Sequence, residues 1–123
     1  SDISAMQDRT VKIAILVIPE STASVIYGLY DMLLSTGRDW HMITEGQSGI
    51  TCIEAFLVAR SRTELEICNG VKVKPHYALH ECPTVDVACV PEVNLPPDAP
   101  LQGRFDAEIQ WLQQCHQQGS ILA

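Results

Sequence analysis

The chain has 123 residues, 46% of them hydrophobic, and carries a formal net charge of −7. This length and composition suit one globular domain, and exclude both a disordered chain and a membrane-spanning helix, which needs about 20 largely apolar residues in a row. Because 15 acidic residues outnumber 8 scattered Lys and Arg residues, the chain lacks the basic surface with which nucleic-acid-binding domains hold phosphates.

The first strand and helix are predicted near the amino-terminus. Val11–Pro19 is a nearly unbroken apolar run rich in Val and Ile, which is typical of a central parallel strand buried on both faces. Residues 22–36 then predict a helix, and Gly37 is expected to end it. The spacing of apolar residues predicts that one side of this helix faces inward, namely Val25, Ile26, Leu29, Met32 and Leu33.

The middle of the chain predicts a second strand, a hairpin and a connector. Residues 38–51 are irregular and suggest an inserted loop or short ribbon, whereas residues 52–61, CIEAFLVARS, predict a strand. Residues 65–75 predict a hairpin because Asn69-Gly70, a strong type I′ turn signal, lies between two short β-prone runs. The next nine residues, HYALHECPT, suggest a connector with at most one helical turn.

The last third predicts a strand, a helix and the start of another strand. VDVACVP (residues 85–91) reads as a buried strand, and a Pro-rich loop separates it from a helix over residues 105–117. SILA (residues 120–123) begins a further strand. This order predicts a three-layer α/β domain whose mainly parallel sheet has Val11–Ile18 at its centre. The inward stripe of the second helix is expected to comprise Phe105, Ile109 and Leu112.

The chain lacks the short motifs that bind common cofactors. It contains no GxGxxG, GxxxxGK[ST], GxSxG or HExxH pattern, so no cofactor is expected. His76, His80 and Cys82 form an H-x3-H-x-C cluster, whose two histidines could share a helical face as a zinc site requires. Because Pro83 follows at once and a fourth ligand is lacking, a surface connector without metal is the favoured interpretation.

Two carboxylates follow predicted strands. Glu20 comes just after the first strand, and Glu92 comes just after the strand of residues 85–91. Ligands of open parallel sheets bind beyond the carboxyl ends of the strands, so both side chains are candidates for acid–base chemistry or ligand binding. The alternative, that both are solvated loop acids, stays open.

The five cysteines favour a reducing compartment. Their number is odd, no CxxC occurs, and no secretory signal precedes them, so we expect reduced thiols in a cytoplasmic protein. Cys89 lies within a predicted strand and Cys115 within a predicted helix. Neither position suits a catalytic nucleophile, which needs an exposed and activated thiolate.

Three segments in order resemble one family. KIAILVIPESTASVIYGLYDMLLSTG resembles the first strand and helix of the ThiJ/PfpI superfamily, and CNGVKVKPHYALHECPTVDVACVPEV resembles its hairpin, connector and third strand. NLPPDAPLQGRFDAEIQWLQQCHQQGSILA resembles the stretch before its nucleophile elbow. The sequence of these segments is most similar to amino-terminal domains of AraC-type transcriptional regulators, where many members have Gly-Pro-x-Glu in place of residues 28–31. The resemblance implies a flavodoxin-like, class I glutamine amidotransferase-like fold.

The resemblance also implies what is missing. SILA resembles the strand that leads into the elbow cysteine, so we expect residues 11–123 to be the amino-terminal, incomplete part of such a domain. Residues 1–10 are polar and carry acids, so we expect them to be a leader. Enzymatic members carry an inward-facing acid where this chain has Val25, and often have Pro-Gly-Gly where this chain has Glu92 in Pro-Glu-Val. We therefore expect no amidase, hydratase or glyoxalase activity.

These expectations favour a ligand-sensing or dimerisation domain of an AraC-family regulator. An unknown small-molecule effector is expected near Glu20, Val25 and Glu92, the protein is expected to be a homodimer, and DNA would be bound only by a separate carboxyl-terminal domain. The alternative is a cysteine-dependent hydratase or amidase of the ThiJ/PfpI type, which needs a cysteine beyond Ala123 and an acid from elsewhere. A flavodoxin-like domain of other ancestry is the third possibility.

Overall fold

The computed structural model describes residues 9–44, 50–93, 95, 97–98, 100 and 102–123. Its main sheet has the strand order β5-β2-β1-β6-β7, and every neighbouring pair in it is parallel. The first strand lies at the centre with the second and third predicted strands beside it, which confirms the predicted arrangement. The five strands are β1 (Arg9–Leu16), β2 (Ile50–Ala59), β5 (Tyr77–Ala78), β6 (Val87–Cys89) and β7 (Ile121–Leu122).

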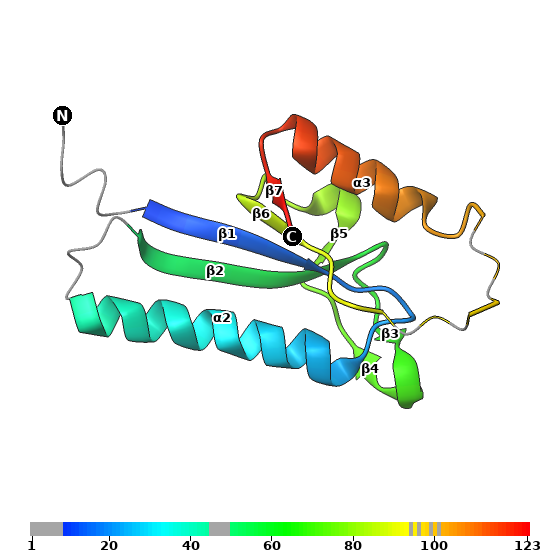
Figure 1. Ribbon diagram of the computed structural model, residues 1–123, viewed down its shortest axis with the longest axis horizontal. Coiled ribbons are helices and arrows are strands. Elements are labelled where there is room, and N and C mark those ends of the chain that lie inside the picture. The colour runs from blue at the N-terminus through cyan, green and yellow to red at the C-terminus, as the bar shows by residue number, and fades with distance from the viewer. Residues whose placement is uncertain (1–8, 45–49, 94, 96, 99, 101) are drawn as a thin grey trace.

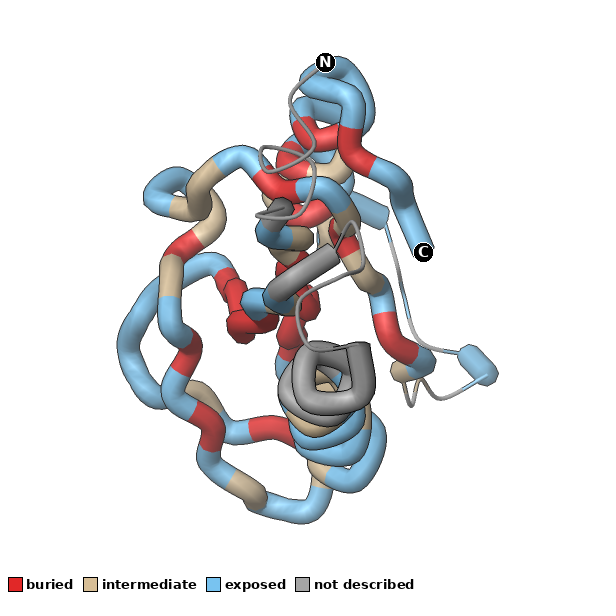
Figure 2. The backbone as a smooth tube through the Cα atoms, turned by 90° about the vertical axis from the view of Figure 1, so that its left-hand side faces the viewer, coloured by how far each residue is buried: buried red, intermediate tan, exposed pale blue. Residues whose placement is uncertain are grey.

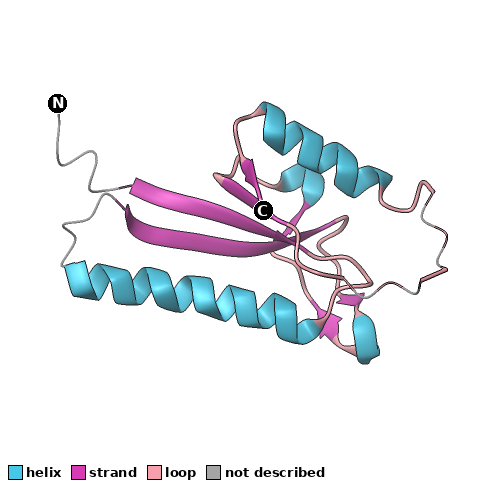
Figure 3. Cartoon of the chain, in the orientation of Figure 1, coloured by secondary structure: helices cyan, strands magenta, loops and turns pink. Residues whose placement is uncertain are grey.

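Two helices cover opposite faces of the sheet (Figures 1 and 3). α2 (Ala23–Thr44) packs along β1 and β2 on one face, and α3 (Asp106–Gln117) lies over β6 and β7 on the other. The three-layer α/β prediction is therefore confirmed. A hairpin of β3 (Leu65–Glu66) and β4 (Lys72–Val73) forms a second, small antiparallel sheet near the start of α2.

The core consists of two layers because β1 is buried on both faces. Ala14, Leu16 and Ile18 point toward α3, where they pack with Trp111, whereas Ile15 and Val17 point toward α2. Successive side chains of a strand alternate between faces, so an unbroken apolar run is what a doubly covered strand requires. Figure 2 shows the buried positions gathered between the two helices, with exposed positions along the outer turns of α2.

The hairpin turn forms as its sequence predicts. Asn69 and Gly70 both have positive φ angles, 64° and 73°, as a type I′ turn requires. Asn and Gly tolerate this left-handed conformation better than other residues. The backbone N–H of Val71 donates to the carbonyl of Cys68 at 3.5 Å across the turn, and the N–H of Ile67 donates to the carbonyl of Val71 at 2.8 Å beside it.

The first helix is longer than predicted. Gly37 was expected to end it, but α2 continues to Thr44, so the predicted loop or ribbon over residues 38–44 is wrong. A glycine within a helix costs about 1 kcal/mol relative to alanine but does not by itself stop the helix, and no proline follows in residues 38–44. Residues 45–49 of that predicted loop lie outside the described residues.

The helix faces also differ in part from the predicted stripes. In α2, Ile26 is fully buried, whereas Val25 is 36% exposed and Met32 is 55% exposed. In α3, Ile109 is 50% exposed, and the buried residues are Glu108, Trp111 and Cys115. Leu29, Leu33, Phe105 and Leu112 of the predicted stripes do pack against the core, so each prediction is confirmed in part. The observed faces are somewhat rotated from the predicted ones, because apolar periodicity alone allows a helix several facing directions and tertiary contacts select one.

The connector contains an edge strand that the sequence did not reveal. β5 pairs with the end of β2, and a single 3₁₀ turn (Leu79–Glu81) follows it. His76 supports this edge, since its backbone N–H donates to the carbonyl of Leu57 and its Nδ1 accepts the N–H of Leu57, both at 2.9 Å. No helix among the described residues is long and apolar enough to cross a bilayer.

Candidate functional site

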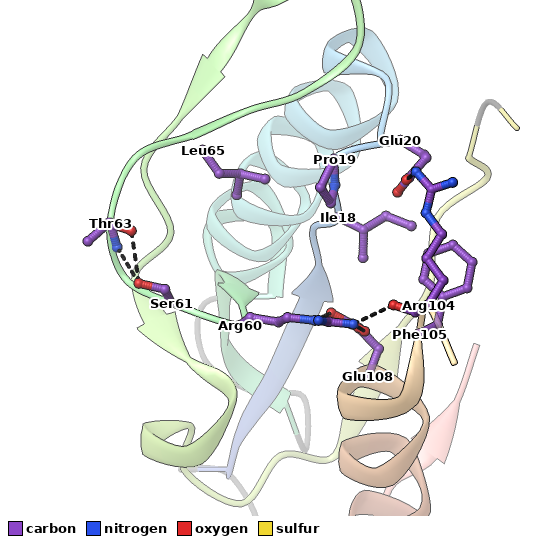
Figure 4. A pocket seen from close by; sticks show the side chains of 10 residues that line it. All are labelled: Ile18, Pro19, Glu20, Arg60, Ser61, Thr63, Leu65, Arg104, Phe105 and Glu108. Carbon is purple, nitrogen blue, oxygen red and sulfur yellow. Dashed lines mark hydrogen bonds and ion pairs between the residues drawn. The ribbon is translucent and has the colours of Figure 1, made fainter. Parts of the chain in front are cut away.

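A pocket of about 300 Å³ lies beyond the carboxyl ends of β1 and β2, the edge at which open parallel sheets bind ligands. It combines apolar side chains with two acids and two arginines that come from three separate segments (Figure 4). Its lining consists of Ile18, Pro19, Glu20, Arg60, Ser61, Thr63, Leu65, Arg104, Phe105 and Glu108.

A tight turn after β1 holds Glu20 in place. The Ser21 N–H donates to the Ile18 carbonyl at 2.9 Å, and the Ile18 N–H donates to Ser21 Oγ at the same distance. The hairpin supports the turn from outside, since the N–H of Cys68 donates to the Ser21 carbonyl at 3.1 Å and its Sγ donates to the Glu20 carbonyl at 3.3 Å. The backbone of Glu20 is thus tied to two elements.

The Glu20 carboxylate is buried and only half paired. Its side chain is 8% exposed, and Arg104 donates from Nη2 to Oε1. The second oxygen, Oε2, has almost no accessible area and no hydrogen-bond partner among the described residues. A buried carboxylate oxygen without a donor is unfavourable, so such a group points to a bound ligand, ion or water.

Arg60 and Glu108 form the second ion pair of the pocket. Arg60 Nε donates to Glu108 Oε2 at 2.6 Å and Nη2 donates to Oε1 at 2.8 Å, a two-pronged arrangement. The Glu108 side chain is 5% exposed and that of Arg60 is 54% exposed. Arg60 also donates to the carbonyl of Arg104, so this pair joins the end of β2 to the start of α3. The hydrogen bond to Glu108 raises the pKa of Arg60 above its usual value.

The three residues expected near a ligand occupy different environments. Glu20 lines the pocket, whereas Val25 and Glu92 do not. Glu92 is exposed, although a backbone bridge between Ser21 and Val93 brings its segment beside that of Glu20. Val25 was expected to face inward but is partly exposed on α2.

Sequence reasoning missed Arg60, Arg104 and Glu108. Arg60 ends an apolar run, and Arg104 ends a loop, so each has the pattern of an ordinary surface residue. Glu108 lies beside the predicted apolar stripe of α3, and nothing in the sequence indicated that this acidic side chain is buried. Arg60 and Glu108 are 48 positions apart in the sequence, and Arg104 and Glu20 are 84 positions apart. These side chains form a site only because the fold brings their segments together.

The H-x3-H-x-C cluster does not form a metal centre. Among the described residues, no group of three or more His, Cys, Asp or Glu side chains could hold a metal ion. His76 Nδ1 is already engaged as a hydrogen-bond acceptor of β2, and the His76 ring stacks on Tyr30 with centroids 5.6 Å apart. The cluster therefore belongs to the connector and sheet edge.

Three cysteines inside the fold are poor nucleophiles. Burial raises the pKa of Cys82 to about 11, with a smaller contribution from Cys115. Burial also raises the pKa of Cys89 and of Cys115. A thiol with a raised pKa holds its proton at neutral pH, whereas the thiolate is the reactive form.

The raised pKa of Cys82 predicts a loss of stability at high pH. Between the ordinary thiol pKa of 9.0 and the folded value of about 11, the folded protein keeps a proton that the unfolded chain has lost. The free energy of unfolding should therefore fall as pH rises through this window, and this thiol should have no such effect below it. Urea unfolding at several pH values should show a shallower fall for Cys82→Ala. The exposed-thiol variant Cys52→Ala controls for loss of a cysteine, and equal slopes for the wild type and Cys82→Ala would contradict the prediction.

Comparison with known proteins shows what the arrangement resembles. No family model and no curated protein sequence matches the chain. The structure is similar to a candidate transcriptional regulator from Vibrio parahaemolyticus, with a TM-score of 0.65, 14% identity, and coverage of 91% of this chain and 54% of that one. It is also similar to a DJ-1 superfamily protein from Agrobacterium tumefaciens, with a TM-score of 0.55, 11% identity, and coverage of 91% and 51%. The chain therefore shares its fold with a DJ-1 superfamily protein.

This DJ-1-like fold is shared with an AraC family transcriptional regulator from Pseudomonas putida. That structure has a TM-score of 0.61 and 11% identity, and the match covers 91% of this chain and 54% of that one. The chain thus spans about half the length of each of these three solved structures. At these identities the comparison confirms the resemblance at the level of the fold.

Proposed function

We propose that the chain is a ligand-sensing or dimerisation domain of an AraC-family transcriptional regulator. The observation that carries the proposal is the likeness to two regulators across 91% of the chain, at TM-scores of 0.65 and 0.61. A fold alone does not imply a function, so the site has to support the proposal as well. DNA would be read by a region of the natural protein other than these acidic 123 residues.

The pocket supports a sensing role. It lies at the edge where ligands of parallel sheets bind, and it contains the buried Glu20 carboxylate with one unpaired oxygen. Its ion pairs join the ends of β1 and β2 to the start of α3, so a ligand that rearranges them would alter the packing of α3. Effector binding is useful to a regulator only if it favours one of two arrangements in this way.

Self-association is the second part of the proposal. β7 is an edge strand, and its side chains Ile121 and Leu122 are 66% and 45% exposed. Ile109 on the adjacent α3 is 50% exposed, which extends the apolar surface. Exposed sheet edges and apolar patches favour pairing with another chain. We propose a homodimer that acts in the cytoplasm, where a regulator meets DNA.

The enzymatic alternative has less support. A hydratase or amidase of this superfamily would need a reactive thiolate, and burial raises the pKa of Cys82, Cys89 and Cys115, so none of these three thiols suits that role. Val25 also offers no carboxylate for proton transfer at the position where the resemblance places the acid of the enzymes.

Selection of DNA fragments by the full-length protein tests the proposal. We expect specific DNA to bind at least about 10³-fold more tightly than random DNA, as is typical of regulators. Sedimentation of the same preparation should show a dimer. Binding that falls with salt but does not discriminate between sequences would contradict the proposal, as would thiol-dependent turnover of amides or isonitriles.

A further inference from the structure

The Glu20 carboxylate has two acceptor oxygens, and among the described residues only one of them accepts a hydrogen bond from a side chain. Arg104 approaches Oε1 through a single nitrogen, and Oε2 has no donor among the described residues. A planar guanidinium or amidinium presents two parallel N–H groups that match the two oxygens of a carboxylate. A cation of that shape would satisfy both oxygens, whereas a single-point ammonium would reproduce the present half-paired state.

The cation now on Glu20 is exchangeable. The Arg104 side chain is 41% exposed and ends a loop, whereas Glu20 is held by the turn after β1 and by the hairpin. A ligand cation that takes the place of Arg104 keeps the buried carboxylate paired, so the exchange avoids the cost of an unpaired buried charge. Oε2 is closed off from solvent while Arg104 is in place on Oε1.

The rest of the pocket suits a small cation with an apolar body. Ile18, Leu65 and Phe105 supply apolar walls within a volume of about 300 Å³, which corresponds to a small ligand. The Arg104 guanidinium carbon lies 5.8 Å from the centroid of the Phe105 ring, so the ring already accommodates a delocalised cation.

Charge balance points in the same direction. A ligand cation that replaces Arg104 leaves Glu20 neutralised and the Arg60–Glu108 pair intact. An anionic ligand would instead meet two buried carboxylates, and both pairing nitrogens of Arg60 are already occupied. The net charge of −7 also attracts cations over longer distances.

We propose that this pocket binds a small guanidinium or amidinium compound, and that Arg104 occupies the position of its cationic group until the ligand displaces it. The inference rests on the proposed sensing function, because it names the class of effector for the same site. Arg104 is then an internal competitor, which lowers the apparent affinity by the fraction of molecules in which it occupies Glu20.

Binding of benzamidine to the full-length protein tests the chemistry. Benzamide has the same shape without the charge, benzylamine is a cation without the planar fork, and benzoate is an anion. Calorimetry or NMR titration should give a dissociation constant for benzamidine at least roughly tenfold below that of benzamide, since charge-assisted bonds are the stronger ones. Equal or tighter binding of any of the three comparators, or no binding of benzamidine, would overturn the proposal.

Two variants with matched controls test the residues. Glu20→Gln should weaken benzamidine binding by roughly tenfold or more, whereas Glu66→Gln removes an exposed carboxylate and should leave it unchanged. Arg104→Ala should tighten binding about two- to fivefold because the competitor is lost, and Arg62→Ala controls for loss of one positive charge. Weaker binding to Arg104→Ala would overturn the competitor role. If Glu20→Gln fails to fold, the proposal is still tested by the four ligands and by the comparison of Arg104→Ala with its control Arg62→Ala.

Failure of the inference and failure of the proposed function can be told apart. Specific DNA binding by a protein that ignores benzamidine would overturn the effector class and leave the regulator. Benzamidine binding with the expected variant pattern, by a protein that does not recognise DNA, would overturn the regulator and leave the chemistry of the pocket.

Discussion

Arg60→Ala is expected to lower the free energy of unfolding by about 2–3 kcal/mol, because it leaves the Glu108 carboxylate without its partner. The Glu108 side chain is 5% exposed, so water cannot fully replace the two hydrogen bonds that Arg60 donates at 2.6 and 2.8 Å. Arg60 itself is 54% exposed, which keeps the expected loss at the low end of the range for buried pairs.

The double variant Arg60→Met/Glu108→Leu separates the cost of an orphaned charge from the value of the pair. Replacing both partners with apolar side chains removes the unpaired carboxylate, so most of the lost stability should return. Arg62→Ala, at an arginine that is 62% exposed and 3.8 Å from its partner Glu81, should change the free energy of unfolding by less than about 0.5 kcal/mol. A double variant that is less stable than Arg60→Ala in urea would contradict this account of the pair.

Ile26→Ala is expected to cost about 3 kcal/mol, whereas Val25→Ala should cost less than about 1 kcal/mol. Ile26 is fully buried against Ile15 and Leu57 under the sheet, so truncation leaves a cavity. Val25 is 36% exposed and loses little contact. The two positions are adjacent in one helix and both are β-branched, so the difference between them reports burial and not helix propensity.

Urea unfolding followed by circular dichroism measures both changes. Equal costs for the two variants, or a larger cost for Val25→Ala, would mean that α2 faces the sheet as the apolar stripe predicted and not as the structure shows. The same comparison bears on the resemblance to the enzymes. A carboxylate at position 25 would lie at a partly exposed site on α2, outside the lining of the pocket.

The parts of the fold that were predicted correctly follow from short sequence patterns. The apolar run of β1 predicted a central strand buried on both faces, since alternate side chains must then all be apolar. Asn69-Gly70 predicted its turn because positive φ angles are a property of those two residues. The end of α2 could not be predicted, and the direction of both helix faces was predicted only in part, because these features depend on which surface each helix packs against.

The sequence alone predicted the fold class from the order of strands and helices, and the central place of β1 from its unbroken apolar run. It also placed Glu20 at the carboxyl edge of the sheet, because this residue follows directly after that run. Only the tertiary structure decided that Glu20 is buried and that Arg104, 84 positions away, lies on it. It likewise decided that Arg60 pairs with Glu108, 48 positions away. Charged residues carry no periodic signal of their partners, so a site built from ion pairs between distant segments becomes visible only when those segments are folded together.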